Sequence, residues 1–468
     1  MPSAFKDKKI TVMGLGLHGG GAAVVKWLAN QGACLTVTDL KNKRQLQPSL
    51  DALKGLKINY VLGRHRELDF VGADLIIQNP GVPRESRYLK IARKKGILIE
   101  NDASLFFKHC PAPIIAVTGT RGKSTTTSLI YELLKQTSKK VWLAGLPQKP
   151  MLEILDRVHP SDIVVLELSS WQLEILGSFK LSPHVSVVTN IYPDHLNRYG
   201  SMAAYIAAKK NIFLWQTSRD STVLNFDNAE TKKLGREVSA RRFWFSKKVF
   251  KEENGVFVVG QKIYLRRFGK QTFLADVSDV NLVGEHNLEN VLAALAVVTM
   301  FGVTNRGIKT VLKKFQNLPG RLQMVFRKGG VEYINDTTAT TPDGTIAALR
   351  ALRSKNLVGK RIVLIAGGAG KNIPTIKYRQ LAKEIKNSCR AVVLFAGEGG
   401  EKIGRTLRAE KFQPVAYDVC TMSEAIGLAN SFAKPGDTVA LSPASASFGM
   451  FINEFDRGDQ FVALVKKL

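Results

Sequence analysis

The sequence has few cysteines and no long apolar run. Four cysteines are spread over 468 residues, and none of their spacings is typical of a metal site. The longest apolar stretch, residues 291–303, is broken by Gly302 and is shorter than the ~20 residues that cross a bilayer. The N-terminal residues MPSAFKDKKI lack the apolar segment of a secretory signal. We therefore expect a cytoplasmic protein with reduced thiols and no membrane segment.

Acidic residues are also scarce. The chain has 39 Asp and Glu residues against 68 Lys and Arg residues, which gives a net charge of +29. Such a surface attracts polyanions, including nucleic acids and nucleotides. The basic residues are scattered, however, and no aromatic-interleaved basic block or zinc module accompanies them. We expect no nucleic-acid partner, and a basic ATP-binding protein acting on nucleic acid is kept as an alternative.

The length and the alternation of patterns predict three α/β domains with parallel sheets. The expected boundaries are residues 1–110, 111–318 and 319–468. Residues 247–269 are richer in aromatic and β-branched residues, and they are expected to form a small antiparallel insertion. The main strands are expected at residues 10–13, 34–38, 114–117, 163–168, 185–189, 361–366, 391–396 and 438–441.

A glycine-rich segment, GLGLHG at residues 14–19, follows the first expected strand and opens a helix. Asp39 ends the next strand about 20 residues later, which matches the dinucleotide-binding fingerprint. Backbone amides at such a helix N-terminus bind phosphate, and the acidic side chain binds a ribose hydroxyl. The pattern indicates a bound nucleotide without specifying which one. A nicotinamide-dependent dehydrogenase is therefore one alternative.

A second phosphate loop, TGTRGKS at residues 118–124, follows the strand at residues 114–117. Its backbone amides form an anion cradle, and the dipole of the following helix adds partial positive charge. Lys123 is placed to neutralise the β- and γ-phosphates, and Ser124 is placed to hold Mg²⁺. A dehydrogenase leaves this loop unexplained, so the pair of loops favours an ATP-dependent enzyme.

Two further residues are candidate metal ligands. Glu167 ends a buried apolar strand, where a carboxylate is costly unless it is paired or bound to a metal. His195 follows another strand, beside Asp194. Carboxylate oxygens are hard ligands suited to Mg²⁺, so these groups are expected near the phosphates of ATP.

The motifs along the whole chain resemble those of the Mur ligases. The loop variant TGTxGKS is found in Mur ligases and folylpolyglutamate synthases, and ELSS at residues 167–170 and SPASASF at residues 442–448 extend the match. The resemblance implies a Rossmann-like N-terminal domain, a central P-loop ATPase-like domain and a C-terminal Rossmann-like domain. The other matching segments are residues 190–196, 205–209, 284–290, 321–322, 335–336 and 455–458.

The resemblance also implies an activity. A Mur ligase uses ATP to convert the carboxylate of a UDP-sugar substrate to an acyl phosphate, which an amino acid then attacks. The glycine-rich first domain and the SPAxAS tail resemble the branch that adds D-glutamate to UDP-N-acetylmuramoyl-L-alanine in peptidoglycan synthesis. Two Mg²⁺ ions, a carbamylated Lys209 and a monomer are implied as well.

The site residues implied by the resemblance fall into five groups. Lys123, His195 and Lys209 are the expected catalytic residues. The expected ATP contacts are Gly119, Thr120, Gly122, Lys123, Ser124, Thr125, Asn290, Arg321 and Asp336. The expected metal ligands are Ser124, Glu167, His195 and carbamylated Lys209. The expected UDP-substrate contacts are Leu17, His18, Asp39, Gly81 and Ser169. The expected amino-acid contacts are Thr340, Lys371, Ser447, Phe448 and Phe455.

Four positions depart from the family pattern near the expected ligands. Thr338 replaces a lysine, Leu146 replaces an asparagine, Arg121 stands where asparagine is usual, and Gly320 replaces a histidine. These changes keep open a variant ligase that adds L-glutamate or another amino acid. Folylpolyglutamate synthase shares the phosphate loop but lacks a glycine-rich UDP-binding domain, so it is a weaker alternative.

Overall fold

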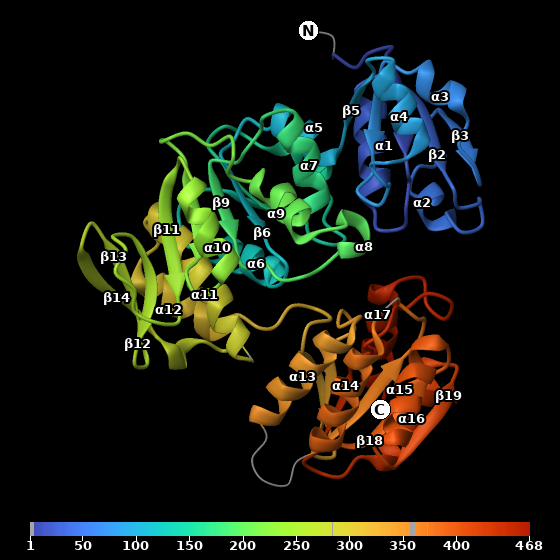
Figure 1. Ribbon diagram of the computed structural model, residues 1–468, viewed down its shortest axis with the longest axis vertical. Helices are drawn as coiled ribbons and strands as arrows, with labels where there is room; N and C mark the ends of the chain where they lie inside the picture. Colours follow the sequence, from blue (N-terminus) through green and yellow to red (C-terminus); the bar gives the residue numbers. More distant parts are fainter. Residues whose placement is uncertain (1–3, 283, 356–360, 372) are drawn as a thin grey trace. The chain divides into compact units, whose positions relative to one another are not determined.

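The computed structural model describes residues 4–468 apart from residues 283, 356–360 and 372. The chain divides into two compact units: Met1–Val280 with Leu288–Lys313, and Asn281–Asn287 with Lys314–Leu468. The first unit holds two sheets and the second holds one, each flanked by helices (Figure 1). This arrangement confirms the predicted three-domain α/β fold. The predicted domain boundaries remain a prediction.

The first sheet is wholly parallel, in the order β3-β2-β1-β4-β5. Strands β1 and β4 are neighbours although five elements of the sequence separate them, so the strand order reverses there. Apolar β1 and β4 side chains are buried against helices, as parallel sheets require. The elements are β1 (Lys9–Met13), α1 (Gly20–Asn30), β2 (Cys34–Asp39), α2 (Gln47–Asp51), β3 (Ile58–Leu62), α3 (Glu67–Val71), β4 (Leu75–Gln78), α4 (Arg87–Lys94), β5 (Leu98–Glu100) and α5 (Asp102–His109).

The central sheet has nine strands in the order β14-β13-β12-β11-β10-β9-β6-β8-β7. Strands β12, β13 and β14 form an antiparallel meander at one edge of this sheet. This meander confirms the expected insertion and extends it to Asp276. The elements are β6 (Ile114–Thr118), α6 (Lys123–Leu134), β7 (Val141–Ala144), β8 (Ile163–Glu167), α7 (Ser170–Ser178), β9 (Val185–Val188), α8 (Leu196–Tyr199), α9 (Met202–Lys210), β10 (Ser221–Asn225), α10 (Ala229–Leu234), β11 (Arg241–Ser246), β12 (Gly255–Val259), β13 (Lys262–Arg267), β14 (Lys270–Asp276), α11 (Glu285–Val298) and α12 (Asn305–Lys314).

The third sheet runs β15-β16-β20-β17-β18-β19. Strands β15 and β16 form an antiparallel hairpin, so the expectation of a purely parallel sheet here is wrong. Gly329 and Gly330 both have positive φ between the paired ends of this hairpin, as its tight turn requires. The elements are β15 (Gln323–Lys328), β16 (Val331–Asn335), α13 (Pro342–Lys355), β17 (Ile362–Gly367), α14 (Thr375–Ser388), β18 (Cys389–Phe395), α15 (Glu398–Ala409), β19 (Val415–Val419), α16 (Met422–Phe432), β20 (Thr438–Leu441) and α17 (Glu454–Val465).

The long apolar run of the sequence belongs to a helix of the protein core. Residues 291–298, within α11, are all fully buried. Their burial explains why the run is apolar on every side. Within the described residues, none of the helices combines the length and the hydropathy needed to span a membrane.

Candidate active site

The second phosphate loop lies between β6 and α6, at the carboxyl edge of the central sheet. Gly119 has a φ of 153°, and Gly122, the N-cap of α6, has a φ of 82°. A Cβ atom on Gly119 would overlap Thr189 Oγ1, and one on Gly122 would overlap Asn290 Oδ1. Both glycines are therefore required by close approach as well as by conformation. Thr120 and Ser124 are buried beside them.

A neighbouring segment, residues 189–192, braces this loop. Thr189 Oγ1 donates to Arg121 O over 2.6 Å, and Thr120 N donates to Asn190 O over 2.9 Å. Arg121 N donates to Asn190 Oδ1 over 2.9 Å. These hydrogen bonds fix the backbone of the loop, which lowers the conformational cost of binding phosphate. Asn190 belongs to a segment that matches the family pattern, but the sequence did not predict this supporting role.

Asn290, an expected ATP contact, lies against the same loop. Its side chain is buried, and its Oδ1 accepts a hydrogen bond from Thr126 Oγ1 at 3.3 Å. The structure therefore places Asn290 beside Gly122 and α6, far along the sequence but next to the phosphate loop.

Glu167 lies at the same edge, because β8 pairs with β6 in a register that places Glu167 opposite Val117. Its Oε2 atom is buried and has no hydrogen-bond partner in the described part of the chain. A buried carboxylate oxygen without a partner is unfavourable unless a cation binds it. Together with the Ser124 hydroxyl, this oxygen fits a hard divalent cation such as Mg²⁺.

Lys209, in α9, is almost completely buried and points at the phosphate loop. Its Nζ donates to Gly119 O over 2.9 Å and lies 3.4 Å from Thr118 Oγ1. Burial, reinforced by the nearby charge of Lys123, holds the pKa of Lys209 well below its usual value. Burial therefore disfavours the protonated form of this amine.

His195 is the more exposed partner in this cluster. It has a φ of 53°, its ring centre lies 5.3 Å from that of Trp171, and its Nε2 lies 3.9 Å from Asp194 Oδ2. Burial, followed by the positive charges of Lys123, Lys209 and Arg121, lowers the pKa of His195 against the opposing effect of Asp194. A neutral imidazole is the form that binds metals.

The described residues contain no group of three or more His, Cys, Asp or Glu side chains that would hold a metal unaided. Magnesium commonly binds through one or two carboxylates, with waters and substrate phosphates completing its coordination. The donors around the phosphate loop fit that mode. They do not fit a metal centre built from protein ligands alone.

The expected UDP contacts of the first domain gather at the point where its strand order reverses. Leu17 and His18 follow β1, and Gly81 follows the neighbouring β4. Asp39 is buried, and its Oδ2 accepts hydrogen bonds from Leu15 N at 2.9 Å and Gly16 N at 3.1 Å. Asp39 therefore braces the glycine loop, a role that the fingerprint did not predict. Ligands bind at such switch points in open α/β sheets.

Ser169, the remaining expected UDP contact, lies in the central domain as the N-cap of α7. Its Oγ donates to Gln172 Oε1 over 2.9 Å. The two domains of the first unit also touch here. Arg198 Nη1 donates to Pro80 O over 3.3 Å, one residue from Gly81.

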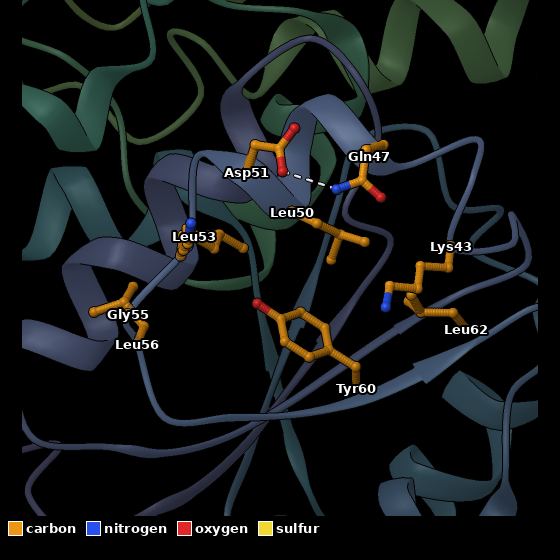
Figure 2. A pocket seen from close by; sticks show the side chains of 10 residues that line it. Lys43, Gln47, Leu50, Asp51, Leu53, Gly55, Leu56, Tyr60 and Leu62 are labelled. Carbon is orange, nitrogen blue, oxygen red and sulfur yellow. Dashed lines mark hydrogen bonds between the residues drawn. The ribbon is translucent and has the colours of Figure 1, made fainter.

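A different pocket in the first domain lies between α2 and the edge strand β3 (Figure 2). Gln47 Nε2 donates to Asp51 Oδ1 over 2.8 Å at its rim, and Tyr60 and Lys43 also line the pocket. Its lining includes none of the predicted site residues. The switch point is therefore the better-supported substrate site.

The second unit has its own cluster at the carboxyl edge of β16, β20 and β17. Lys371 Nζ donates to Thr340 Oγ1 over 2.8 Å, so two expected amino-acid contacts meet. Ser447 is buried in the loop after β20, whereas Phe448 is 64% exposed and Phe455 is half-buried. The lysine at the site is suited to binding a carboxylate.

Asp336 and Arg321, two expected nucleotide contacts, belong to this unit. Asp336 is buried, with its Oδ2 accepting from Ser442 Oγ at 2.7 Å and its Oδ1 from Leu322 N at 3.0 Å. Burial outweighs these bonds and raises the pKa of Asp336 to about 7. Arg321 is exposed, and its charge opposes that rise.

A phosphate loop, a carboxylate suited to Mg²⁺ and a lysine-bearing strand edge define an ATP-utilising α/β enzyme. The family models agree. The Mur ligase middle domain matches residues 117–298, the Mur ligase glutamate ligase domain matches residues 320–445, and the MurD-like N-terminal domain matches residues 8–100. The chain belongs to the Mur ligase family and is an ATP-dependent ligase.

Full-length relatives support the same conclusion. A UDP-N-acetylmuramoylalanine–D-glutamate ligase from Roseiflexus sp. is 42% identical, covering 98% of each chain. A ligase of the same name from Acetivibrio thermocellus is 37% identical, covering 99% of this chain and 97% of its own.

Solved structures share the fold. The UDP-N-acetylmuramate–alanine ligase MurC of Thermotoga maritima matches with a TM-score of 0.63 at 21% identity, covering 98% of this chain and 99% of its own. The MurF ligase of the same organism, solved in complex with ADP, matches with a TM-score of 0.57 at 19% identity, covering 93% of this chain and 95% of its own.

The raised pKa of Asp336 predicts a pH-dependent stability. Between about pH 4, the usual pKa of an unfolded Asp, and about pH 7, the folded chain holds a proton that the unfolded chain has lost. Stability from this group is therefore lost as pH rises through that window. Relative to wild type, Asp336→Asn should gain roughly 1–3 kcal/mol in unfolding free energy between pH 5 and pH 8.

Urea denaturation of the ligand-free protein at both pH values measures this gain. Asp418→Asn is the control for the change in net charge, because Asp418 is exposed on β19. An Asp336→Asn difference that is the same at both pH values would contradict the assignment.

Proposed function

We propose that this chain joins D-glutamate to UDP-N-acetylmuramoyl-L-alanine, with ATP as the energy source, as a cytoplasmic monomer. The observation that carries the proposal is the meeting of Gly119, Glu167 and Lys209 at one edge of the central sheet. The full-length relatives that bear the D-glutamate ligase name support the choice of substrates.

The first step transfers phosphate to a carboxylate. A carboxylate oxygen of the UDP-sugar substrate attacks the γ-phosphorus of ATP, the bond to the β–γ bridging oxygen breaks, and ADP leaves. The loop amides and Lys123 offset the negative charge of the phosphates, since Lys123 opens α6 beside them. Two Mg²⁺ ions, held by Ser124, Glu167, His195 and carbamylated Lys209, would neutralise further charge when bound.

In the second step, the neutral amine of glutamate attacks the carbonyl carbon of the acyl phosphate. The C–O bond to the phosphate breaks, inorganic phosphate leaves, and the nitrogen loses a proton as the amide forms. Lys371 and Thr340 would bind a carboxylate of glutamate, with Ser447, Phe448 and Phe455 completing the site. Thr338 supplies no cation here, because its side chain is an uncharged hydroxyl, whose Oγ1 donates to Gly320 O over 2.9 Å. That difference from the family pattern keeps L-glutamate as the second candidate substrate.

The UDP moiety would bind at the switch point of the first sheet. Leu17, His18 and Gly81 lie on adjacent loops there, and Asp39 holds the glycine loop in place. Ser169 would contact the substrate from the central domain, near the phosphate loop edge. The ATP phosphates would bind along the Gly119–Thr125 segment, while Asn290, Arg321 and Asp336 would contact the nucleotide.

A phosphate-release assay tests the proposal. Release should require ATP, Mg²⁺, UDP-N-acetylmuramoyl-L-alanine and D-glutamate together, and L-glutamate should not replace D-glutamate. Lys123→Ala should abolish release, because it removes charge from the γ-phosphate site. Lys135→Ala, at the exposed end of the same helix, should leave release unchanged. Release with L-glutamate alone would overturn the stereochemical assignment, and release without any amino acid would overturn the ligase assignment.

We further propose that Lys209 is carbamylated. The neutral amine attacks CO₂, loses a proton and becomes a carbamate, whose anionic oxygens ligate Mg²⁺ where an ammonium group would not. Lys209 Nζ already lies within hydrogen-bond distance of the phosphate loop. Lys209→Ala should lose at least about 100-fold in turnover, the scale expected when charge stabilisation is removed.

Small carboxylic acids such as acetate should restore part of the lost Lys209→Ala activity, because they supply the missing oxygens. Lys210→Ala, its neighbour in α9, is the matched control, since Lys210 pairs with Glu237 instead. Full activity of Lys209→Ala without added acid would rule out the modification's role.

A further inference from the structure

Arg457 is a fully buried arginine in the first turn of α17. Its guanidinium donates to two loops of the same unit. Nε donates to Thr337 Oγ1 over 3.0 Å, Nη2 to Thr337 O over 2.9 Å, and Nη1 to Ser445 O over 3.3 Å. The sequence placed Arg457 inside a matching motif but gave it no function.

This guanidinium forms no ion pair among the described residues. Burial lowers the pKa of Arg457 to about 10, and the charge of Glu454 opposes the change. A buried cation without a carboxylate partner is costly, even when carbonyl oxygens accept its hydrogens. The cost of burying this cation therefore indicates that Arg457 has a function besides stabilising the fold.

The bonds of Arg457 join the loops that carry the proposed glutamate contacts. Thr337 lies three residues before Thr340 in the loop after β16, and Ser445 lies two residues before Ser447 in the loop after β20. Strands β16 and β20 are paired neighbours, so these loops leave the same edge of the sheet.

A third loop also reaches this point. A Cβ atom on Gly368 would lie 3.9 Å from Arg457 Nη1. Gly368 begins the loop after β17, and Lys371 belongs to the same loop. Arg457 therefore lies where the three loops of the proposed amino-acid site come together.

We propose that Arg457 is a positioning residue that fixes these loops and, through its uncompensated charge, favours an amino acid with a second, side-chain carboxylate. The proposal rests on the proposed function, because it concerns the amino-acid site of that reaction. Its hydrogen bonds set the spacing between Thr340 and Ser447, and its charge adds to that of Lys371 at the same edge.

Steady-state kinetics of Arg457→Met and Arg457→Lys test the proposal. Arg457→Met should raise the KM for glutamate about 10- to 100-fold, the scale of losing hydrogen bonds made by a charged group. The KM values for ATP and the UDP-sugar should stay within about twofold of wild type. Arg457→Lys keeps the charge but not the forked geometry, so its KM for glutamate should be intermediate.

The ratio of kcat/KM for glutamate to that for glutamine distinguishes two roles of Arg457. A role in positioning the loops and supplying charge changes this ratio, whereas a role in stabilising the fold alone does not. Arg457→Met should lower this ratio about tenfold, and Arg457→Lys should keep it near the wild-type value. Arg390→Met is the matched control. Arg390 pairs with Asp437 over 2.6 Å at the opposite edge of the same sheet, so its loss should lower thermal stability without changing the ratio. An Arg457→Met ratio equal to that of Arg390→Met would overturn the proposal.

Thr337→Val is a milder variant for the case in which Arg457→Met does not fold. It removes the hydroxyl that accepts from Nε and keeps the side-chain shape, so a smaller rise in the glutamate KM is expected. An unchanged KM would overturn the positioning role. If the wild-type protein turned over neither glutamate enantiomer, the proposed function itself would be overturned. If the wild type were active and the variants had the same kinetics for glutamate, only the inference on Arg457 would be overturned.

Discussion

Parallel strands end at one edge of their sheet, and this constraint organises every site in the chain. In the first sheet it brings the glycine loop after β1 next to Gly81 after β4. In the central sheet it sets Glu167 opposite Val117, beside the phosphate loop. In the third sheet it gathers the loops after β16, β20 and β17. The loops supply the chemistry, and the strand order determines which loops meet.

Each of the two units also holds a buried ionisable group close to its site. Lys209 donates to the carbonyl of Gly119, and Asp336 accepts from Ser442. Burial shifts their pKa values in opposite directions, downward for the lysine and upward for the aspartate. Arg457 is buried as well, and its guanidinium donates to the carbonyl oxygens of Thr337 and Ser445. Perturbed groups of this kind cluster at functional sites because catalytic and binding groups need pKa values matched to their task.

The features predictable from the sequence were those with local signals. Both phosphate-type loops, with Lys123 and Glu167, could be read from glycine spacing and from a carboxylate at the end of an apolar strand. Strand and helix positions in the three sheets followed from apolar patterns, and the antiparallel insertion followed from its aromatic and β-branched residues. The β15–β16 hairpin was missed although Gly329-Gly330 is a turn signal.

Long-range roles had no such signal. Asn190 braces the phosphate loop from about 70 residues away, and Arg457 bonds to Thr337 at a separation of 120 residues. Asp39 was identified from its spacing, but its bonds to the amides of Leu15 and Gly16 depend on the three-dimensional turn. These roles arise from strand order and loop packing, which periodicity does not encode.

The central claim is that the chain activates a substrate acid by transferring phosphate to it. The most direct measurement follows ¹⁸O from the labelled alanyl carboxylate of UDP-N-acetylmuramoyl-L-alanine during turnover with ATP and glutamate. The account predicts one ¹⁸O atom in each released phosphate, because the carboxylate oxygen that attacks the γ-phosphorus leaves with it. Unlabelled phosphate alongside normal amide formation would contradict the account.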